Sequence, residues 1–324
     1  EIALMLDFKR LRHLAVGLLI GGLLPGLASA EQTLRIGYQK SSTLLTLLKA
    51  RGTLEQRLQA EGIRVSWHEF PSGLPLLEAL NLGNVDLSAD VADTVPVFTQ
   101  AAGARLTYFA RETPSPTAQA ILVPADSPLK TLADLKGKRV AVTKAAGSHY
   151  LLIQALEKAG LSFKDISPAY LIPADGRAAF ENHKVDAWVT WDPYVASAQR
   201  QQHARILADG SGLASYQRYY LAGTDYAQAY PEVLQQVYLA LREIGQWTKA
   251  NPDAAARVLG PLWGNLDSTT VQQANARRSY DVQPVRLDDL GEQQRIADAF
   301  LREGLLPKAV DARAVTLYQP QATE

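Results

Sequence analysis

The chain has 324 residues, enough for two domains of ordinary size whose hydrophobic cores need no disulfide or metal to stabilise them. Lysine plus arginine number 33 and aspartate plus glutamate number 33, so the formal net charge is zero and nothing indicates a nucleic-acid-binding polyelectrolyte. Hydrophobic residues make up 47% and charged residues 20%, which excludes a disordered chain or a polytopic membrane protein, and the absence of cysteine excludes thiolate metal sites and cysteine nucleophiles.

The first thirty residues have the three regions of a secretory signal peptide. Lys9, Arg10 and Arg12 precede an apolar run at residues 14–24, and a small-residue Ala-Ser-Ala site ends at Ala30. The apolar run is shorter than the about 20 residues that span a bilayer. A lipid-anchored protein would need a cysteine at the cleavage site. We therefore expect a signal peptide at residues 1–30, cleavage after Ala30, and a mature chain free in the periplasm.

Beyond the signal peptide, short β-branched runs alternate with longer helical patterns, which is typical of an α/β fold with largely parallel sheets. In the first stretch the patterns predict strands over 33–38, 64–70, 84–87 and 106–111, a helix over 74–82, and helices that open at 41–42 and 93–94. Pro114 and Pro116 follow within a few residues of each other. Such a proline pair marks a crossover between domains rather than the interior of an element.

The second stretch repeats this alternation. It predicts strands over 120–123, 139–143, 170–172, 185–190, 205–208 and 218–223, with helices over 131–135, 147–159, 178–182 and 193–201. From Pro231 onward the pattern is almost wholly helical, with predicted helices over 231–251, 252–260, 268–280 and 288–303. Pro231 and Pro252 stand where first-turn prolines belong, and we expect these helices to pack on the first lobe.

The chain is therefore expected to cross between two lobes near 113–119 and to return near 216–223. This predicts a first lobe of residues 31–116 and 220–324 and a second lobe of residues 117–219. Two crossovers between lobes indicate a clamshell that closes on a ligand.

Motifs that carry enzyme chemistry are absent from the sequence. It contains no phosphate-binding loop, no dinucleotide-binding glycine motif, no Gly-x-Ser-x-Gly and no His-Glu-x-x-His. The histidines are few and scattered. We therefore expect no catalysis, no cofactor and no metal site.

Polar and small residues recur where a predicted strand ends and a helix begins. Ligands of open α/β sheets bind at the carboxyl ends of the strands, and helix starts offer N–H groups to anions. Each serine or threonine there has a plain alternative role as a helix N-cap. Because four such junctions converge, we interpret them as a ligand site. Its candidate residues are Gln39, Ser41, Ser42, Asp93, Thr94, Gly147, Ser148, His149, Trp191 and Asp192.

Several longer motifs give the chain a family resemblance. Together they are similar to the periplasmic aliphatic-sulfonate-binding proteins of ABC importers, across nearly all of the mature chain. The motifs are LRIGYQK at 34–40, EFPSG at 69–73, LEALNLG at 77–83, QAAGA at 100–104, LADLKGK at 132–138, PADGRAAF at 173–180, DAWVTWDPY at 186–194 and LPK at 306–308.

The resemblance implies a two-lobed periplasmic binding protein fold of type II that closes on a sulfonate anion. It implies delivery of the ligand to an inner-membrane permease and its ATPase, in a monomeric protein that binds no nucleic acid and does not insert into the membrane. Nitrate, taurine or sulfate esters are the alternative ligands within the family. The motifs place Gln39, Ser41 and Ser42 in the first-strand loop, residues 147–149 at the helix start, and Trp191 and Asp192 on the other side of the cleft.

Two departures from the family pattern lie at the expected cleft. The segment at residues 88–96 is one residue longer than the glycine-rich segment common in the family, and Ala145, Ala146 and Tyr150 replace the small or polar residues usual around the Ser-His pair. The organic group of the ligand is therefore left open. Arg111, Arg177 or Arg218 could add a positive charge or remain ordinary solvated residues.

Overall fold

The computed structural model describes residues 32–321, and its helices and strands lie within that part of the chain. The expected signal peptide at residues 1–30 lies outside the described residues. In residues 32–321 no helix combines the length and the apolar character that a bilayer span requires.

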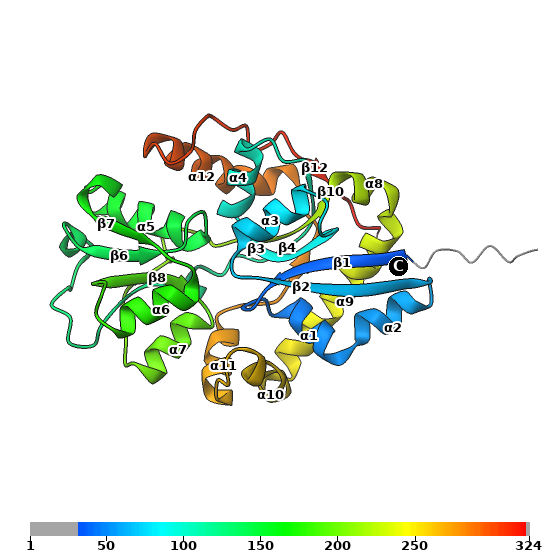
Figure 1. The fold of residues 1–324 in the computed structure, drawn as a ribbon, viewed down its shortest axis with the longest axis horizontal. Helices are drawn as coiled ribbons and strands as arrows, with labels where there is room; N and C mark the ends of the chain where they lie inside the picture. Colours follow the sequence, from blue (N-terminus) through cyan, green and yellow to red (C-terminus); the bar gives the residue numbers. More distant parts are fainter. Residues whose placement is uncertain (1–31, 322–324) are drawn as a thin grey trace, which may run out of the picture. The chain divides into compact units, whose positions relative to one another are not determined.

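A seven-stranded sheet forms the core of the first lobe (Figure 1). Its strands are β1 (Gln32–Gln39), β2 (Ile63–Phe70), β3 (Leu87–Ala92), β4 (Leu106–Glu112), β10 (Arg218–Gly223), β11 (Val282–Gln283) and β12 (Thr316–Leu317). The order is β11-β4-β10-β3-β1-β2, with β12 beside β4. β1 lies between β2 and β3 and runs parallel to both, so that Ile36 is opposite Trp67 on one side and Leu87 on the other.

A five-stranded sheet forms the second lobe. Its strands are β5 (Gln119–Val123), β6 (Arg139–Val142), β7 (Ser167–Tyr170), β8 (Ala187–Trp191) and β9 (Arg205–Asp209), in the order β7-β6-β8-β5-β9. The α/β class and the two-lobed architecture expected from the sequence are therefore confirmed. The lobe boundaries at 116/117 and 219/220 stay predictions.

The direction of two predicted strands differs from the expectation of largely parallel sheets, and the short β11, which was not predicted, also runs antiparallel to β4. β10 runs antiparallel to β3 and β4, and β5 runs antiparallel to β8 and β9. Both strands directly follow a segment that passes from one sheet to the other, so they enter their sheets without a βαβ crossover. A buried strand is an apolar run whether it is parallel or antiparallel to its neighbours, so the sequence pattern does not distinguish the two directions.

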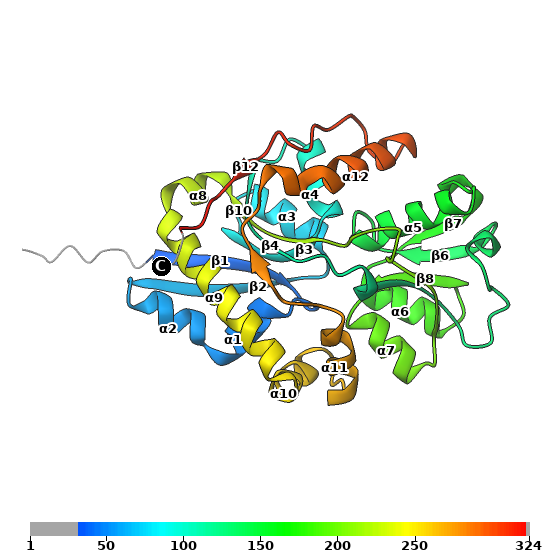
Figure 2. The same cartoon turned by 180° about the vertical axis from the view of Figure 1, so that it is seen from behind.

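Helices cover the faces of both sheets (Figures 1 and 2). They are α1 (Leu44–Arg51), α2 (Thr53–Gln59), α3 (Gly73–Asn81), α4 (Thr94–Ala101), α5 (Gly147–Lys158), α6 (Pro173–Glu181), α7 (Tyr194–Gln201), α8 (Thr224–Ala229), α9 (Pro231–Ala250), α10 (Pro252–Leu262), α11 (Ser268–Ala276) and α12 (Gly291–Arg302). Pro231 and Pro252 occupy the first turns of α9 and α10, as predicted.

The sequence patterns missed several short elements. α2, α8, β11 and β12 were not expected, β3 begins at Leu87 rather than at residue 84, and α11 ends at Ala276 rather than at residue 280. The predicted helix over 131–135 is a 3-10 turn at Leu132–Leu135. Gly52 separates α2 from α1: its left-handed backbone (φ 64°) ends α1, and α2 begins at the next residue.

Two C-terminal helices contact the second lobe as well as the first. α9 packs on α1 and α2, in agreement with the expectation that the C-terminal helices return to the first lobe. α11 packs on α10 and also lies beside α7, and α12 packs against both α4 and α5 (Figure 2). The two lobes are thus bridged by helix contacts on either side of the space between the sheets.

Candidate functional site

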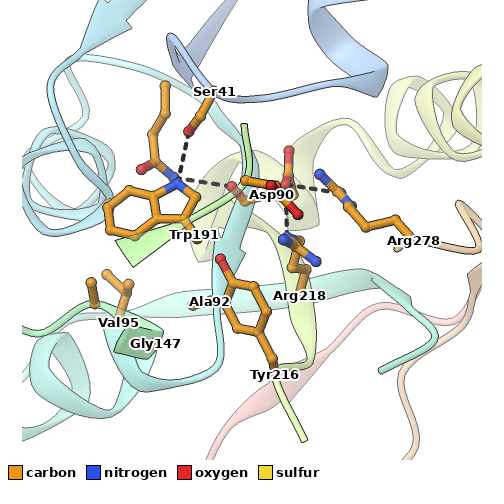
Figure 3. A pocket seen from close by; sticks show the side chains of 13 residues that line it. Ser41, Asp90, Ala92, Val95, Gly147, Trp191, Tyr216, Arg218 and Arg278 are labelled. Atoms are coloured by element: carbon orange, nitrogen blue, oxygen red, sulfur yellow. Dashed lines mark hydrogen bonds and ion pairs between the residues drawn. The ribbon is translucent and has the colours of Figure 1, made fainter. Parts of the chain in front are cut away.

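A small cavity, part of it open to solvent, lies where the elements of the two sheets meet (Figure 3). It is lined by Gln39, Ser41, Gly73, Asp90, Ala92, Val95, Ala146, Gly147, Trp191, Asp192, Tyr216, Arg218 and Arg278. β1, β3 and β8 reach this cavity at their carboxyl ends, the expected place for a ligand in open α/β sheets.

Gly147 brings the start of α5 close to the first lobe. A Cβ atom added there would lie 2.7 Å from Cε2 of Tyr216 and 2.9 Å from Cβ of Ala92, a residue of β3. Only glycine permits this approach without a shift of its neighbours. Because the first N–H groups of a helix have no partner within it, the backbone of α5 offers hydrogen-bond donors at the cavity.

Trp191 and Ser41 close one side of the cavity. Nε1 of Trp191 donates a hydrogen bond of 3.1 Å to Oγ of Ser41, which joins the end of β8 to the loop after β1. The ring of Tyr194 stands edge-on to that of Trp191, with centroids 5.8 Å apart. Trp191 is only 7% exposed, so the contact is largely shielded from solvent.

Two buried arginines face two buried carboxylates beside the cavity. Arg278 Nη2 lies 2.6 Å from Glu112 Oε1 and 3.2 Å from Asp90 Oδ2. Arg218 Nε lies 3.5 Å from the same Asp90 oxygen, and its guanidinium stacks 4.1 Å from the ring centroid of Tyr216. Figure 3 shows Asp90 between the two guanidinium groups. With two positive and two negative charges, the cluster is formally neutral before a ligand binds.

The two carboxyl groups of this cluster differ in their electrostatics. Burial raises the pKa of Asp90 in spite of the facing Arg278, and the nearby Glu112 adds to the rise. Burial also acts to raise the pKa of Glu112, but the positive charges of Arg278 and Arg218 outweigh this effect and hold the pKa below its ordinary value. Asp90 Oδ1 is buried without a hydrogen-bond partner in the described residues. Glu112 is therefore the firmly ionised partner of the arginines.

Asp192 is held by a third arginine and by the start of α7. Both of its carboxylate oxygens lie 2.9 Å from Nη1 of Arg277, and the backbone N–H of Ala196 donates to Oδ1 at 3.0 Å. Burial raises the pKa of Asp192 to about 6, against the opposing effect of Arg277. Asp192 thus pairs with an N–H group in the first turn of α7, although the N-cap position itself is Pro193.

Half of the predicted site residues line the cavity, namely Gln39, Ser41, Gly147, Trp191 and Asp192. Ser42 supports the loop from behind, because its Oγ accepts a hydrogen bond from the backbone N–H of Gln39 at 3.2 Å. The ligand contacts assigned to all ten residues stay predictions.

Asp93 and Thr94 lie just behind the cavity, at the start of α4. Asp93 Oδ2 accepts a hydrogen bond from the backbone N–H of Gln217 at 3.0 Å, and burial raises its pKa to about 7. Thr94 is fully buried and its Oγ1 has no partner in the part of the chain that the structure describes. Neither side chain caps its helix.

Ser148 and His149 follow Gly147 in α5 but do not line the cavity. Ser148 is fully buried, its Oγ has no partner in residues 32–321, and the N-cap of α5 is Ala146, so the capping role considered for Ser148 is wrong. The ring of His149 packs among Phe98, Phe163, Tyr170 and Phe300. Burial lowers the pKa of His149 to about 3, and its Nδ1 accepts a hydrogen bond from the N–H of Ala145.

Sequence reasoning missed Arg278, Tyr216 and Asp90 as site residues and weighed Arg218 without selecting it. Arg218 carried a usable signal, a lone arginine at the start of an otherwise apolar strand. Arg278 carried none, because the segment after α11 reaches the cavity only through tertiary packing. In the described part of the chain no group of three or more acidic or histidine side chains could hold a metal ion.

The arrangement can hold a small anion out of water. It combines backbone N–H groups, an indole N–H and guanidinium groups in a buried setting, where charge-assisted hydrogen bonds are strongest.

Comparisons with known proteins point in the same direction. The NMT1/THI5 like family matches residues 58–255. An aliphatic sulfonates-binding protein of Escherichia coli is 41% identical over 296 residues, which cover 91% of this chain and 92% of the relative. A taurine-binding periplasmic protein of the same organism is 24% identical over 233 residues, 67% of each chain.

A solved structure agrees with the fold as well as with the sequence. The alkanesulfonate-binding protein SsuA from Xanthomonas axonopodis pv. citri, bound to MOPS, is 41% identical and matches with a TM-score of 0.82. The match covers 88% of this chain and 98% of that protein.

Proposed function

The chain belongs to the NMT1/THI5-like family and, within it, to the aliphatic sulfonate-binding proteins, and we propose that it captures alkanesulfonates or related organosulfonates and delivers them to an ABC importer for sulfur acquisition. The relatives are named as binding proteins, and we assign this chain a binding role without catalysis. The choice of alkanesulfonate over taurine rests on the identities of 41% and 24% to the two kinds of relative.

The observation that carries the proposal is the buried cavity between the sheets with its hydrogen-bond donors. A sulfonate carries one delocalised negative charge on three acceptor oxygens and stays unprotonated near neutral pH, so it needs several N–H and O–H donors. The N–H groups of Gly147 and Ser148, the indole of Trp191 and the guanidinium of Arg218 supply them. The ligand's oxygens would replace Ser41 as the acceptor of the Trp191 N–H.

The hydrogen-bond donors of the cavity can supply the binding free energy that micromolar affinity requires. A hydrogen bond to a charged group contributes about 1.5–3 kcal/mol, and micromolar affinity requires about 8 kcal/mol after ordering costs. Three or four such donors, together with burial of the organic group, reach this value.

We infer that the mature protein acts in the periplasm, from the signal peptide expected at residues 1–30 and from the periplasmic relatives. Its partners are then an inner-membrane permease and its ATPase. Closure of the two lobes around the ligand, with the hinges at residues 113–119 and 216–223, would present the loaded protein to the permease.

Titration calorimetry on residues 31–324 tests the proposal with methanesulfonate, butanesulfonate, taurine, nitrate and a sulfate ester. We expect one-to-one binding of the alkanesulfonates. In a separate unfolding experiment, a ligand concentration of one hundred times the dissociation constant should raise the free energy of unfolding by about 2.7 kcal/mol. Nitrate, taurine or the sulfate ester bound far more tightly than every alkanesulfonate would assign the protein to another branch of the family.

A further inference from the structure

A second pocket lies next to the candidate sulfonate cavity, on the far side of the Trp191–Ser41 contact. It is partly open to solvent, and its lining comes from both lobes. Ser41 lines this outer pocket as well as the inner cavity, so the two spaces share a wall. Pro173 and Tyr194 come from α6 and α7, whereas Trp263 and Leu266 come from the segment between α10 and α11.

Three side chains lie where the linings of the two spaces meet: Trp191 lines the inner cavity, Tyr194 lines the outer pocket, and Ser41 lines both. Trp191 donates its 3.1 Å hydrogen bond to Ser41, and Tyr194 packs edge-on against Trp191. Both contacts are between side chains, and Trp191 and Tyr194 are the groups that would have to change rotamer to connect the two spaces. A ligand whose anionic end occupies the inner cavity would place its next atoms at this wall.

The outer pocket has the character of an apolar site with a polar rim. Trp263 and Leu266 are each 7% exposed, and Pro173 is buried. Arg177 is already bound to Glu181 and Gln201, with distances of 2.7 and 2.8 Å from its nitrogens to their side-chain oxygens. Lys40 is exposed at the rim. An alkyl chain or ring would therefore meet aromatic and aliphatic surface here, with its far end close to solvent.

We propose that the outer pocket binds the organic group of the sulfonate, so that the protein selects sulfonates with longer alkyl chains or rings over short ones. The inference rests on the proposed function, because it takes the inner cavity as the sulfonate site. It assigns Trp263, Leu266 and Tyr194 a role in specificity that the inner cavity does not require. Burying each methylene contributes about 0.8 kcal/mol, equivalent to about a fourfold gain in affinity per methylene.

Calorimetry with methanesulfonate and octanesulfonate separates the two sites. Ala174 is an exposed residue of α6 that lines the outer pocket, so Ala174→Trp fills the pocket without disturbing a buried position. Ala178 is exposed on the same helix and does not line the pocket, which makes Ala178→Trp the matched control. The chain-length preference of the unchanged protein is measured alongside both variants.

We expect the unchanged protein and Ala178→Trp to bind octanesulfonate at least about tenfold more tightly than methanesulfonate. Ala174→Trp should bind methanesulfonate normally and lose at least about tenfold of its octanesulfonate affinity. Equal affinity of the unchanged protein for the two sulfonates, or an Ala174→Trp variant that keeps the full preference, would overturn the outer-pocket assignment alone. Failure of the unchanged protein to bind either sulfonate would overturn the proposed function together with it.

Discussion

Arg277 and Asp192 form an ion pair between the two lobes, with Nη1 2.9 Å from each carboxylate oxygen. Asp192 follows β8 of the second sheet and lines the cavity, whereas Arg277 follows α11 on the side of the first lobe. Nη2 of Arg277 also donates to Oε1 of Gln199 in α7 at 2.6 Å. These contacts join α11 to the end of β8 and to α7, next to the candidate ligand site.

Removal of this contact should weaken ligand binding by making closure less favourable. In Arg277→Gln, Asp192 would be buried in the closed state without its charge partner, a situation that is strongly unfavourable in proteins. We expect sulfonate affinity to fall about ten- to a hundredfold by calorimetry. Arg200→Gln on the exposed face of α7 is the control. An unchanged affinity in Arg277→Gln would mean that the pair does not contribute to closure.

Gly147→Ala should interfere with closure by a different route. The added Cβ would lie 2.9 Å from Cβ of Ala92 in the first lobe, a contact that is relieved when the lobes separate, and 2.7 Å from Cε2 of Tyr216 in the segment that leads back to the first lobe. We expect binding to weaken by more than about tenfold and solution scattering to give a larger radius of gyration with ligand than the unchanged protein. Gly291→Ala at the start of α12 serves as the control, because its Cβ would meet only Nη1 of Arg295, at 4.0 Å. Normal affinity in Gly147→Ala would contradict the closed geometry.

The Ser148→Ala variant tests whether the Ser148 hydroxyl donates a hydrogen bond to the ligand or only contributes to the fold. Because Ser148 does not cap α5 and its Oγ lacks a partner within residues 32–321, its loss should leave the melting temperature of the ligand-free protein nearly unchanged. Because we assign the Ser148 hydroxyl as a donor to the sulfonate, its loss should weaken binding by about 1.5–3 kcal/mol, or roughly ten- to a hundredfold. Ser268→Ala, an exposed serine in the first turn of α11, is the control. Unchanged affinity would remove Ser148 from the site.

Asp93 should make the folded state less stable as the pH rises from about 4 to about 7. Its pKa is raised by burial from 3.8 to about 7, so within this range the folded chain holds a proton that the unfolded chain has released. Asp93→Asn keeps the acceptor for the Gln217 N–H and removes the titration. We expect the stability of Asp93→Asn relative to the unchanged protein to increase with pH across this range in urea unfolding. A constant difference would show that Asp93 does not titrate there.

His149 should have the opposite effect of pH on stability. Burial lowers its pKa from 6.5 to about 3, so between these values the unfolded chain binds a proton that the folded chain excludes. Its contribution to stability is therefore complete above pH 6.5 and is lost as the pH falls toward 3. His149→Asn, with an oxygen in place of Nδ1 for the Ala145 N–H, should show a weaker loss of stability in acid. Parallel pH profiles of the two proteins would contradict this assignment.

The strand-to-helix junctions were predictable from the sequence because they combine an apolar run with small and polar residues. Gln39, Ser41, Gly147 and Trp191 were found in this way. Arg278 was not predictable, since it reaches the cavity only after α9 to α11 have folded back on the first lobe. His149 shows the converse problem. A histidine next to a junction is read as polar, but the side chain turns into an aromatic cluster between α4, α5 and α12.

Binding of a sulfonate in the cavity between the two sheets can be tested directly because of the composition of the chain. The sequence contains no cysteine and a single methionine, Met5, within the expected signal peptide. Residues 31–324 therefore contain no sulfur atom. In a crystal of this mature chain with butanesulfonate, the ligand would be the only source of anomalous scattering from sulfur, provided that the crystallisation medium is free of sulfur.

An anomalous difference map from such a crystal is the decisive measurement. We expect one strong peak per chain, between the first turn of α5 at Gly147 and the indole of Trp191, with the sulfonate oxygens in hydrogen-bond contact with the backbone N–H of Gly147. A sulfur peak elsewhere on the protein, or a closed cavity without a peak at saturating butanesulfonate, would show that the sulfonate does not bind between the sheets.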